Sequence, residues 1–258
     1  MKTYPMKTRA ILICLVGLAL AAGATNSDAV ARVFAVQTSP EATPGNTDPT
    51  TSATLGANEV LAGQIADRIA AAWPMVTSYR AVTTILPVIG TPEATPIVEL
   101  AGYAERVVVL PDTKSITIRD QGATVEIVLA GGVLSKRTTE PGGASGAWER
   151  IDPANISADD PFGITYQTML SPESPPYSGL SDRQRARVGM DQGAVMIEAR
   201  ECREYVFPEV TETGEQIQVR IYLDSTDLPC RIETTAGMTI SRTDYVFNQV
   251  TAIATPDA

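Results

Sequence analysis

QIQVRIYLDSTDLPCRIETT, residues 216–235, is the stretch that decides the fold of this chain. Two runs rich in β-branched residues, 216–223 and 229–235, flank a turn-rich segment. Pro229 cannot donate a ladder hydrogen bond inside a central strand, so it marks the end of that turn. The stretch therefore predicts two strands joined by a turn. Further strand-like runs at 199–207 and 238–247 predict a strand on either side.

Strand patterns also dominate the chain upstream of this stretch. The runs are punctuated by Pro-Asp, Gln-Gly and Gly-Gly pairs at spacings typical of antiparallel hairpins. They cover residues 79–89, 97–110, 115–119, 124–130, 133–138 and 147–151. Residues 152–188 are less regular, with a short helix predicted near 161–170 and a polar loop after it.

One amphipathic helix precedes the strands. Asn58 is a good N-cap, and the pattern ends near Pro74. The apolar stripe recurs at i+4 spacing, which is one helix face, and consists of Leu61, Ile65, Ile69 and Trp73. No second helix of comparable strength follows, so a sheet is the expected partner of this stripe. The fold class is thus α+β, mostly β. It has about ten or eleven antiparallel strands in a curled sheet, with the helix against its concave face.

The N-terminus has the features of a secretory signal peptide. Basic residues at positions 2, 7 and 9 precede an apolar run at 11–22, which is short for a membrane span. Small residues then predict cleavage between Ala24 and Thr25, so residues 1–24 are the signal peptide. Lipidation at Cys14 is the alternative considered, but aliphatic residues precede this cysteine near the start of the run. An uncleaved segment kept as an anchor is the other alternative; the main expectation is export without a stable membrane anchor.

A Pro-, Thr- and Ser-rich segment, residues 25–56, follows the signal peptide and has almost nothing to bury. It is expected to be a disordered tether. Residues 57–256 then form the folded domain.

Charge and composition exclude several functions. The formal net charge is −10, and removal of the signal peptide leaves 17 basic against 30 acidic residues. This balance disfavours nucleic acid and anionic lipid surfaces as partners. The chain contains no histidine, which removes the usual general base and the commonest metal ligand. We expect no catalytic residues, no metal and no cofactor. A carboxylate enzyme built on Glu198, Glu201 and Glu204 is the weaker alternative, because nothing indicates that these residues converge on a pocket.

Two cysteines remain after the signal peptide, Cys202 and Cys230. An exported chain meets an oxidising compartment, so the pair predicts a structural disulfide. Two buried free thiols are the alternative.

The order of these parts resembles the LolA-like superfamily of exported proteins. This superfamily includes the periplasmic lipoprotein carriers and the mycobacterial lipid-binding lipoproteins of the LppX and LprG type. The resemblance is carried by the helix before the first strand, by Trp148 in a strand after a glycine turn, and by a strand that ends in Asp224, a turn and Leu228-Pro229. It implies a half-barrel whose open side is covered by helices, with acyl chains bound in the cavity between them. It also implies an arginine near the cavity, for which Arg80 and Arg106 are candidates by position only.

The function expected from these observations is binding of a lipid or other hydrophobic ligand by an exported, non-catalytic protein of the periplasm or cell envelope. Leu61, Ile65, Ile69 and Trp73 would line the cavity, and ordinary core packing is the alternative role for them. The alternative function is an envelope sensor or interaction domain with a filled core and an envelope protein as its partner.

Overall fold

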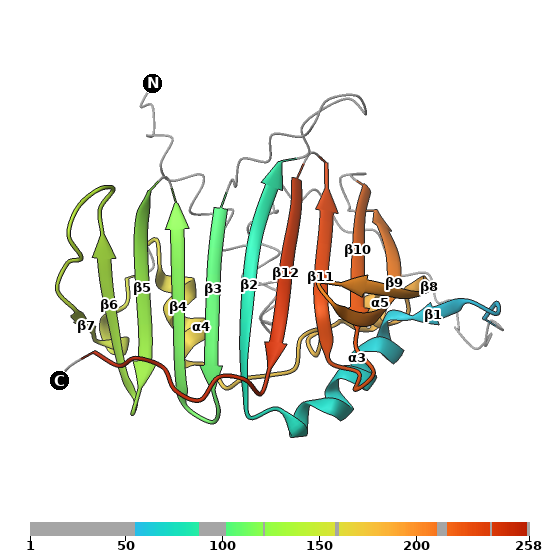
Figure 1. Ribbon diagram of the computed structural model, residues 1–258, viewed down its shortest axis with the longest axis horizontal. Coiled ribbons are helices and arrows are strands. Elements are labelled where there is room, and N and C mark those ends of the chain that lie inside the picture. The colour runs from blue at the N-terminus through green and yellow to red at the C-terminus, as the bar shows by residue number, and fades with distance from the viewer. Residues whose placement is uncertain are drawn as a thin grey trace, which may run out of the picture.

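The computed structural model describes residues 55–87, 102–120, 122–157, 160–210, 216–237 and 239–256. Twelve strands in these residues form one antiparallel sheet (Figure 1). The strands are β1 (Glu59–Leu61), β2 (Ser78–Pro87), β3 (Gly102–Val109), β4 (Thr113–Asp120), β5 (Ala123–Ala130), β6 (Val133–Thr139), β7 (Glu149–Ile151), β8 (Val188–Ile197), β9 (Arg200–Val210), β10 (Gln216–Leu223), β11 (Pro229–Ala236) and β12 (Thr239–Phe247). The helices are α3 (Ala62–Ala72), α4 (Gly163–Leu170) and α5 (Asp182–Arg185), with short 3₁₀ turns at Trp73–Met75 and Pro153–Asn155.

The sheet curls without closing. Its strand order is β1-β8-β9-β10-β11-β12-β2-β3-β4-β5-β6-β7, so β1 and β7 form the two edges. Strand β2 pairs with β12 from Thr239↔Pro87 to Phe247↔Tyr79, which places the first long strand in the middle beside the last one. This arrangement confirms a mostly β, curled antiparallel half-barrel.

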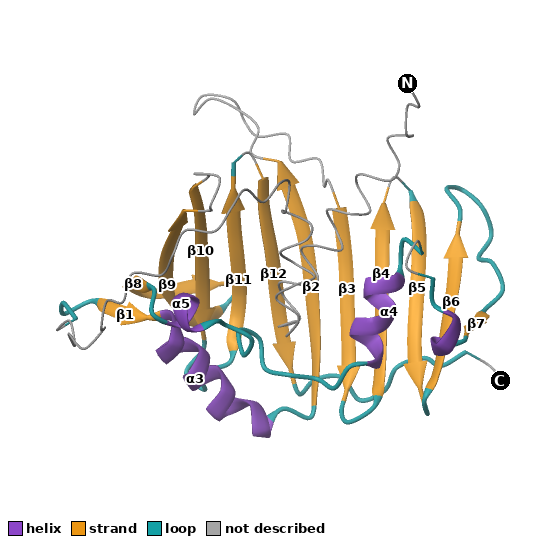
Figure 2. Cartoon of the chain, turned by 180° about the vertical axis from the view of Figure 1, so that it is seen from behind, coloured by secondary structure: helices purple, strands orange, loops and turns teal. Residues whose placement is uncertain are grey.

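The helices lie on one face of the sheet (Figure 2). Helix α3 buries Ile65 and Ile69 against side chains of β9, β10, β11 and β12, including Tyr205 and Ile221. Helix α4 buries Tyr166 and Met169 in a second, separate cluster over β4, β5 and β6. The expected amphipathic helix therefore covers only one half of the concave face, and α4, which matches the short helix predicted near 161–170, covers the other half.

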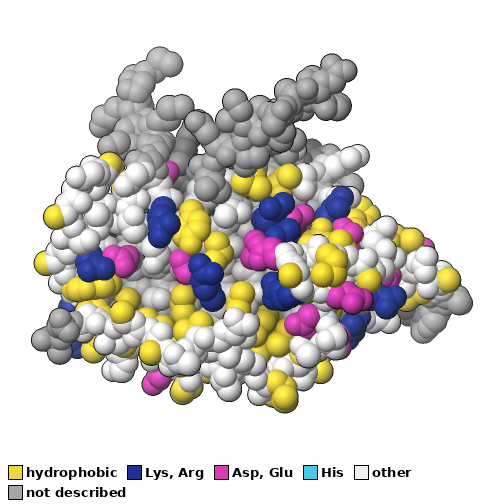
Figure 3. Space-filling model, in the orientation of Figure 1, with side chains coloured by type: hydrophobic (Ala, Val, Ile, Leu, Met, Phe, Trp, Pro, Cys, Tyr) yellow, Lys and Arg dark blue, Asp and Glu magenta, His cyan; other side chains and the backbone are white. Residues whose placement is uncertain are grey.

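The opposite face of the sheet carries cross-strand ion pairs, which Figure 3 shows as interspersed basic and acidic side chains. On neighbouring strands Arg80 pairs with Glu105 at 2.5 Å, and Arg231 pairs with Asp244 at 2.6 Å. Arg231 lies directly opposite Asp244, whereas Arg80 and Glu105 are diagonal neighbours. Opposite charges on adjacent strands stabilise a solvent-facing sheet surface. The polar outer face leaves the helix-covered face as the apolar one.

Two details of the fold predicted from the sequence were wrong. Residues 59–61 form strand β1, which pairs with residues 188–190 of β8, so helix α3 begins at Ala62. Strand β8 lies between the irregular region 152–188 and the strand predicted at 199–207, where no element was predicted.

Strand β8 could not be predicted from the sequence, because glycines interrupt its strand pattern. A Cβ on Gly189 would lie 2.4 Å from Cδ1 of Phe207, so the close approach of β9 requires glycine at this position. Gly193 has φ +90° at a register shift between Asp191 and Gly193, which is a bulge that breaks the two-residue alternation.

Candidate functional site

The four residues expected to line a cavity lie at one end of the concave face. Ile65 and Ile69 have no exposed surface and pack in the cluster under α3. Leu61 lies on β1 and Trp73 in the 3₁₀ turn after α3, and both are only partly buried. The structure thus brings Ile65, Ile69 and Trp73 to one cluster and places Leu61 off the helix.

Trp73 joins a group of aromatic rings on β2 and β12, which we call the aromatic group: Trp73, Tyr79, Tyr245 and Phe247. The ring centroids of Trp73 and Tyr79 are 5.6 Å apart, and those of Tyr245 and Phe247 stack at 5.8 Å. These separations are typical of favourable aromatic pairs. The group packs from the end of α3 to the middle of the sheet, and its members Tyr79 and Tyr245 are buried in the core.

Beside this group lies a buried charge cluster formed by Tyr79, Arg106, Lys114 and Glu173. Oε1 of Glu173 accepts a hydrogen bond from Nη2 of Arg106 at 2.5 Å and lies 2.8 Å from Nζ of Lys114. Oε2 of the same carboxylate accepts from the Tyr79 hydroxyl at 2.5 Å. The side chains of the three charged residues are at most 6% exposed. One carboxylate therefore meets two cations and a phenol away from water.

Strand alternation and register place these side chains together. In β3, Ala104, Arg106 and Val108 face the helices, while the residues between them face outward. In β4, Lys114 and Ile116 share that inward face, and Val108 pairs with Lys114 across the two strands. Because side chains alternate between faces, the register fixes both cations on the concave side.

Glu173 comes from the loop after α4. Nζ of Lys114 donates a hydrogen bond to the carbonyl oxygen of Ser171, which is the first residue after the helix. This contact holds the end of α4 over β4. The loop then carries the carboxylate of Glu173 over β3 and β2.

The environment shifts two ionisation equilibria in the cluster. Burial alone would raise the pKa of Glu173, but attraction to Arg106 and hydrogen bonds from Lys114 and Tyr79 outweigh it and lower this pKa. Burial raises the pKa of Tyr79 well above its ordinary value, and the neighbouring Glu173 adds to this effect. Glu173 is therefore ionised and Tyr79 neutral at physiological pH.

The hydrogen bonds of Arg106 are incomplete. Its Nε and Nη1 atoms are buried and have no hydrogen-bond partner in the part of the chain that the structure describes. Buried guanidinium donors are normally satisfied, because an unmet buried donor costs free energy. The cluster thus presents free donors from a buried cation.

The structure separates the two arginines that position alone could not distinguish. Arg106 faces inward to this cluster, whereas Arg80 faces outward and pairs with Glu105. The sequence alone did not identify Lys114 and Glu173 as site residues. A lysine among β-branched residues is the only local signal for Lys114, and Glu173 in a Pro/Ser loop gives none.

The three glutamates of the weaker enzyme hypothesis do not converge on a pocket. Glu198 lies in the turn between β8 and β9 with φ 56°, and Glu201 is exposed. Glu204 faces the outer side of the sheet, where Arg220 donates a hydrogen bond to it at 3.0 Å. Among the described residues no group of three or more potential metal-ligating His, Cys, Asp or Glu side chains occurs.

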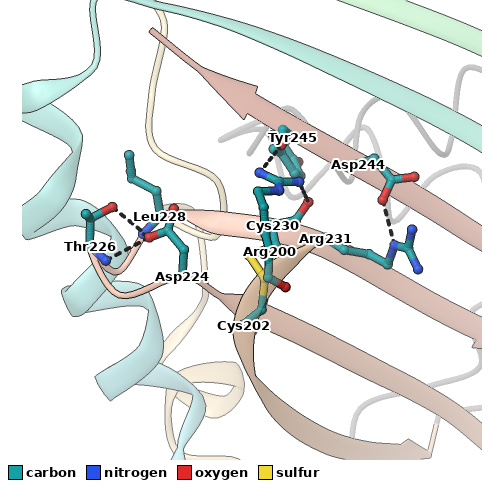
Figure 4. Close-up of a disulfide and its surroundings, with 9 residues drawn as sticks. All are labelled: Arg200, Cys202, Asp224, Thr226, Leu228, Cys230, Arg231, Asp244 and Tyr245. Atoms are coloured by element: carbon teal, nitrogen blue, oxygen red, sulfur yellow. Dashed lines mark hydrogen bonds and ion pairs between the residues drawn. A yellow bond between two sulfur atoms is a disulfide. The ribbon is translucent and has the colours of Figure 1, made fainter. Parts of the chain in front are cut away.

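The predicted disulfide is present. Cys202 of β9 and Cys230 of β11 are bonded past the end of β10, where the turn from Asp224 to Leu228 leaves the sheet (Figure 4). Arg200 continues this link, since its guanidinium donates to the carbonyl oxygens of Tyr245 and Cys230. The bond pins the end of the β8–β9 hairpin to the middle of the sheet.

The predicted cleavage site between Ala24 and Thr25 lies outside the described residues, as does almost all of the tether. No helix within the described residues is long and apolar enough to cross a membrane.

No family model and no curated protein matches this sequence. Solved structures with a similar fold exist at low identity. The lipoprotein LppX of Mycobacterium tuberculosis is 11% identical with a TM-score of 0.44, over 75% of this chain and 98% of that one. LprF of Mycobacterium bovis is 13% identical with a TM-score of 0.46, over 76% and 97%. A putative outer membrane lipoprotein-sorting protein domain of Vibrio parahaemolyticus is 9% identical with a TM-score of 0.24, over 74% and 93%.

Proposed function

We propose that this protein is an exported, non-catalytic binding protein that holds an acyl chain or another hydrophobic ligand against the concave face of its sheet. In this proposal residues 1–24 direct export to the periplasm or outer envelope, residues 25–56 are a tether, and residues 57–256 form the binding domain.

The division of the core is the observation that carries the proposal. A domain of this size usually buries one contiguous hydrophobic core. Here the clusters under α3 and α4 are separate. Between them, the inward-facing positions of β2 and β12 include Thr83 and Thr243. Both are buried, and their hydroxyls form a hydrogen bond with each other at 2.9 Å. Ile85 is buried there as well and belongs to neither cluster.

A ligand between the two helices would touch apolar surface on both sides. The aromatic group borders this region toward α3, and Ala104 and Ile116 border it toward α4. In this proposal the side toward α3 is lined by Leu61, Ile65, Ile69 and Trp73. Apolar walls with a few convergent polar groups are typical of small-molecule sites.

A second candidate is an envelope sensor or interaction domain with a filled core. The observation in its favour is the complete burial of Ile65 and Ile69, which already make the contacts of ordinary core residues. Recovery of a stoichiometric envelope protein, without lipid, would support this candidate.

Native mass spectrometry of protein secreted into an oxidising compartment tests the binding function. We expect a stoichiometric acyl-chain adduct on the wild-type chain, identified after lipid extraction. Ala104→Phe fills the region between the helices and should lower ligand occupancy. Val107→Phe, on the same strand but facing outward, is the matched control and should retain the ligand. Bare protein from several expression hosts, with only the two hydrogens of the disulfide missing, would count against binding and favour the second candidate.

A further inference from the structure

We infer that the buried charge cluster of Tyr79, Arg106, Lys114 and Glu173 binds the acidic headgroup of an amphiphile, a carboxylate or a phosphate, whose chain lies against the concave face. This inference rests on the proposed function and specifies the ligand: an anionic amphiphile instead of a neutral lipid.

The charge balance of the cluster is the first argument. Arg106 and Lys114 are both buried and both pair with the single carboxylate of Glu173. No other ion pair joins either cation among the described residues. A buried charge without a counter-charge is strongly unfavourable, so two buried cations and one anion leave room for a second anion.

The free donors of Arg106 are the second argument. Glu173 occupies Nη2, while Nε and Nη1 are buried without a partner in the described chain. Guanidinium groups bind carboxylate and phosphate oxygens with strong, charge-assisted hydrogen bonds. An acidic headgroup at this place would supply acceptor oxygens for donors that are otherwise unmet.

The surroundings of the cluster are apolar, as a chain next to the charged head would require. The ring of Tyr79 belongs to the aromatic group, and its hydroxyl reaches Glu173. Across the strands, Arg106 pairs in register with Ala81 on one side and Ile116 on the other, and both are buried apolar residues. A charged head at Arg106 therefore continues directly into apolar surface in both directions. This polarity matches an amphiphile better than a free anion.

Titration calorimetry with delipidated protein tests this assignment. The probes are dodecanoate, which is anionic, and 1-dodecanol, which has the same chain length and no charge, at a pH where the acid is ionised. Acetate and inorganic phosphate serve as anions without a chain. We expect dodecanoate to bind at least about ten-fold more tightly than 1-dodecanol, since hydrogen bonds to charged groups are the strong ones. Acetate and phosphate should bind far more weakly than dodecanoate.

Three variants locate the effect. Arg106→Gln should abolish the preference for the acid while 1-dodecanol still binds, which shows that the site has folded. Arg80→Gln, on the next strand but facing outward, is the matched control and should keep the preference. Glu173→Gln removes the competing carboxylate and should increase the preference for the acid, a gain that misfolding cannot produce.

The outcomes separate the headgroup site from the binding function. Equal affinity for dodecanoate and 1-dodecanol in the wild-type protein would overturn the headgroup site and leave the binding function standing. Tight binding of acetate or phosphate without any binding of 1-dodecanol would support an anion site and contradict the acyl-chain function. Loss of the acid preference in Arg80→Gln as strong as in Arg106→Gln would also overturn the assignment, because the outer arginine does not face the cluster.

Discussion

Glu173 organises the polar centre of the concave face. It reaches Tyr79, Arg106 and Lys114 over sequence separations of 94, 67 and 59 residues, which joins the middle of the sheet to the loop after α4. Its removal would leave two buried cations without their shared counter-charge. The same contacts that lower its pKa make the folded protein depend on its ionisation.

Glu173→Gln should lower the free energy of unfolding at neutral pH by about 3–5 kcal/mol, the usual cost of breaking a buried ion pair. The folded-state pKa of Glu173 is lowered, so its contribution is fully present above the unfolded-state value, about 4.3. It is lost as the pH falls further, through the lowered pKa of the folded state. Urea unfolding of both proteins at neutral pH and at about pH 3 measures this. A stability difference that stays constant between the two pH values would contradict this role of Glu173.

At the scale of secondary-structure elements, the turn between β10 and β11 links the sheet to helix α3. Oδ1 of Asp224 accepts from the backbone N–H of Thr226 at 2.8 Å and from that of Leu228 at 3.2 Å. Asp227, with φ 65°, pairs with Arg68 of α3, and Arg68 also donates to the Tyr205 hydroxyl at 2.7 Å. The turn thus connects the sheet to α3. Next to the same turn, the disulfide joins β9 to β11.

Replacement of both Cys202 and Cys230 by serine should destabilise the protein by roughly 3 kcal/mol, since the bond closes a loop with a sequence separation of 28 residues. Urea unfolding with and without a thiol reductant measures it. The reductant should bring the wild-type midpoint down to that of the double variant and leave the variant unchanged. A wild-type midpoint that ignores the reductant, with full reduction shown by thiol titration, would contradict the prediction.

Ile69 tests how firmly α3 packs on the sheet. Ile69→Ala should cost about 2–5 kcal/mol and Ile69→Val about 0.5–1.5 kcal/mol, because the residue is fully buried in the cluster under α3. Chemical unfolding measures both losses. Two small and equal losses would contradict tight packing of α3 on the sheet.

At the scale of the whole molecule, the two faces of the sheet have different roles. The outer face carries the cross-strand ion pairs, while the inner face holds two cores under two helices with the charge cluster between them. A ligand that binds only this folded arrangement must stabilise it.

Delipidated protein should therefore gain thermal stability with added dodecanoate, by about 2.7 kcal/mol at a free concentration one hundred times the dissociation constant. Thermal unfolding in a ligand titration measures the gain. Arg106→Gln should show a much smaller gain at the same concentration, and Arg80→Gln the full gain. The same increase with acetate alone would attribute the stabilisation to the anion instead of the amphiphile.

Local patterns in the sequence determined most of the fold. These patterns are two-residue alternation, the turn around Asp224, the i+4 stripe of Ile65 and Ile69, and a single pair of cysteines. They predict a curled antiparallel sheet, the helix and the disulfide, because each depends on residues close in sequence or on a single possible pairing. Strand β8 was not predicted, because its glycines allow the close approach of β9 and form a bulge. Neither is visible without the neighbouring strand.

Only the tertiary structure decided the site. The two faces of β3 are both mixed in the sequence, with Ala104, Arg106 and Val108 on one and Tyr103, Glu105 and Val107 on the other. Alternation therefore shows that Arg106 and Glu105 point in opposite directions, but the direction of each is set by the cores under α3 and α4. Glu173 joins Arg106 and Lys114 only through the path of the loop after α4, and long-range packing of this kind leaves no periodic trace in the sequence.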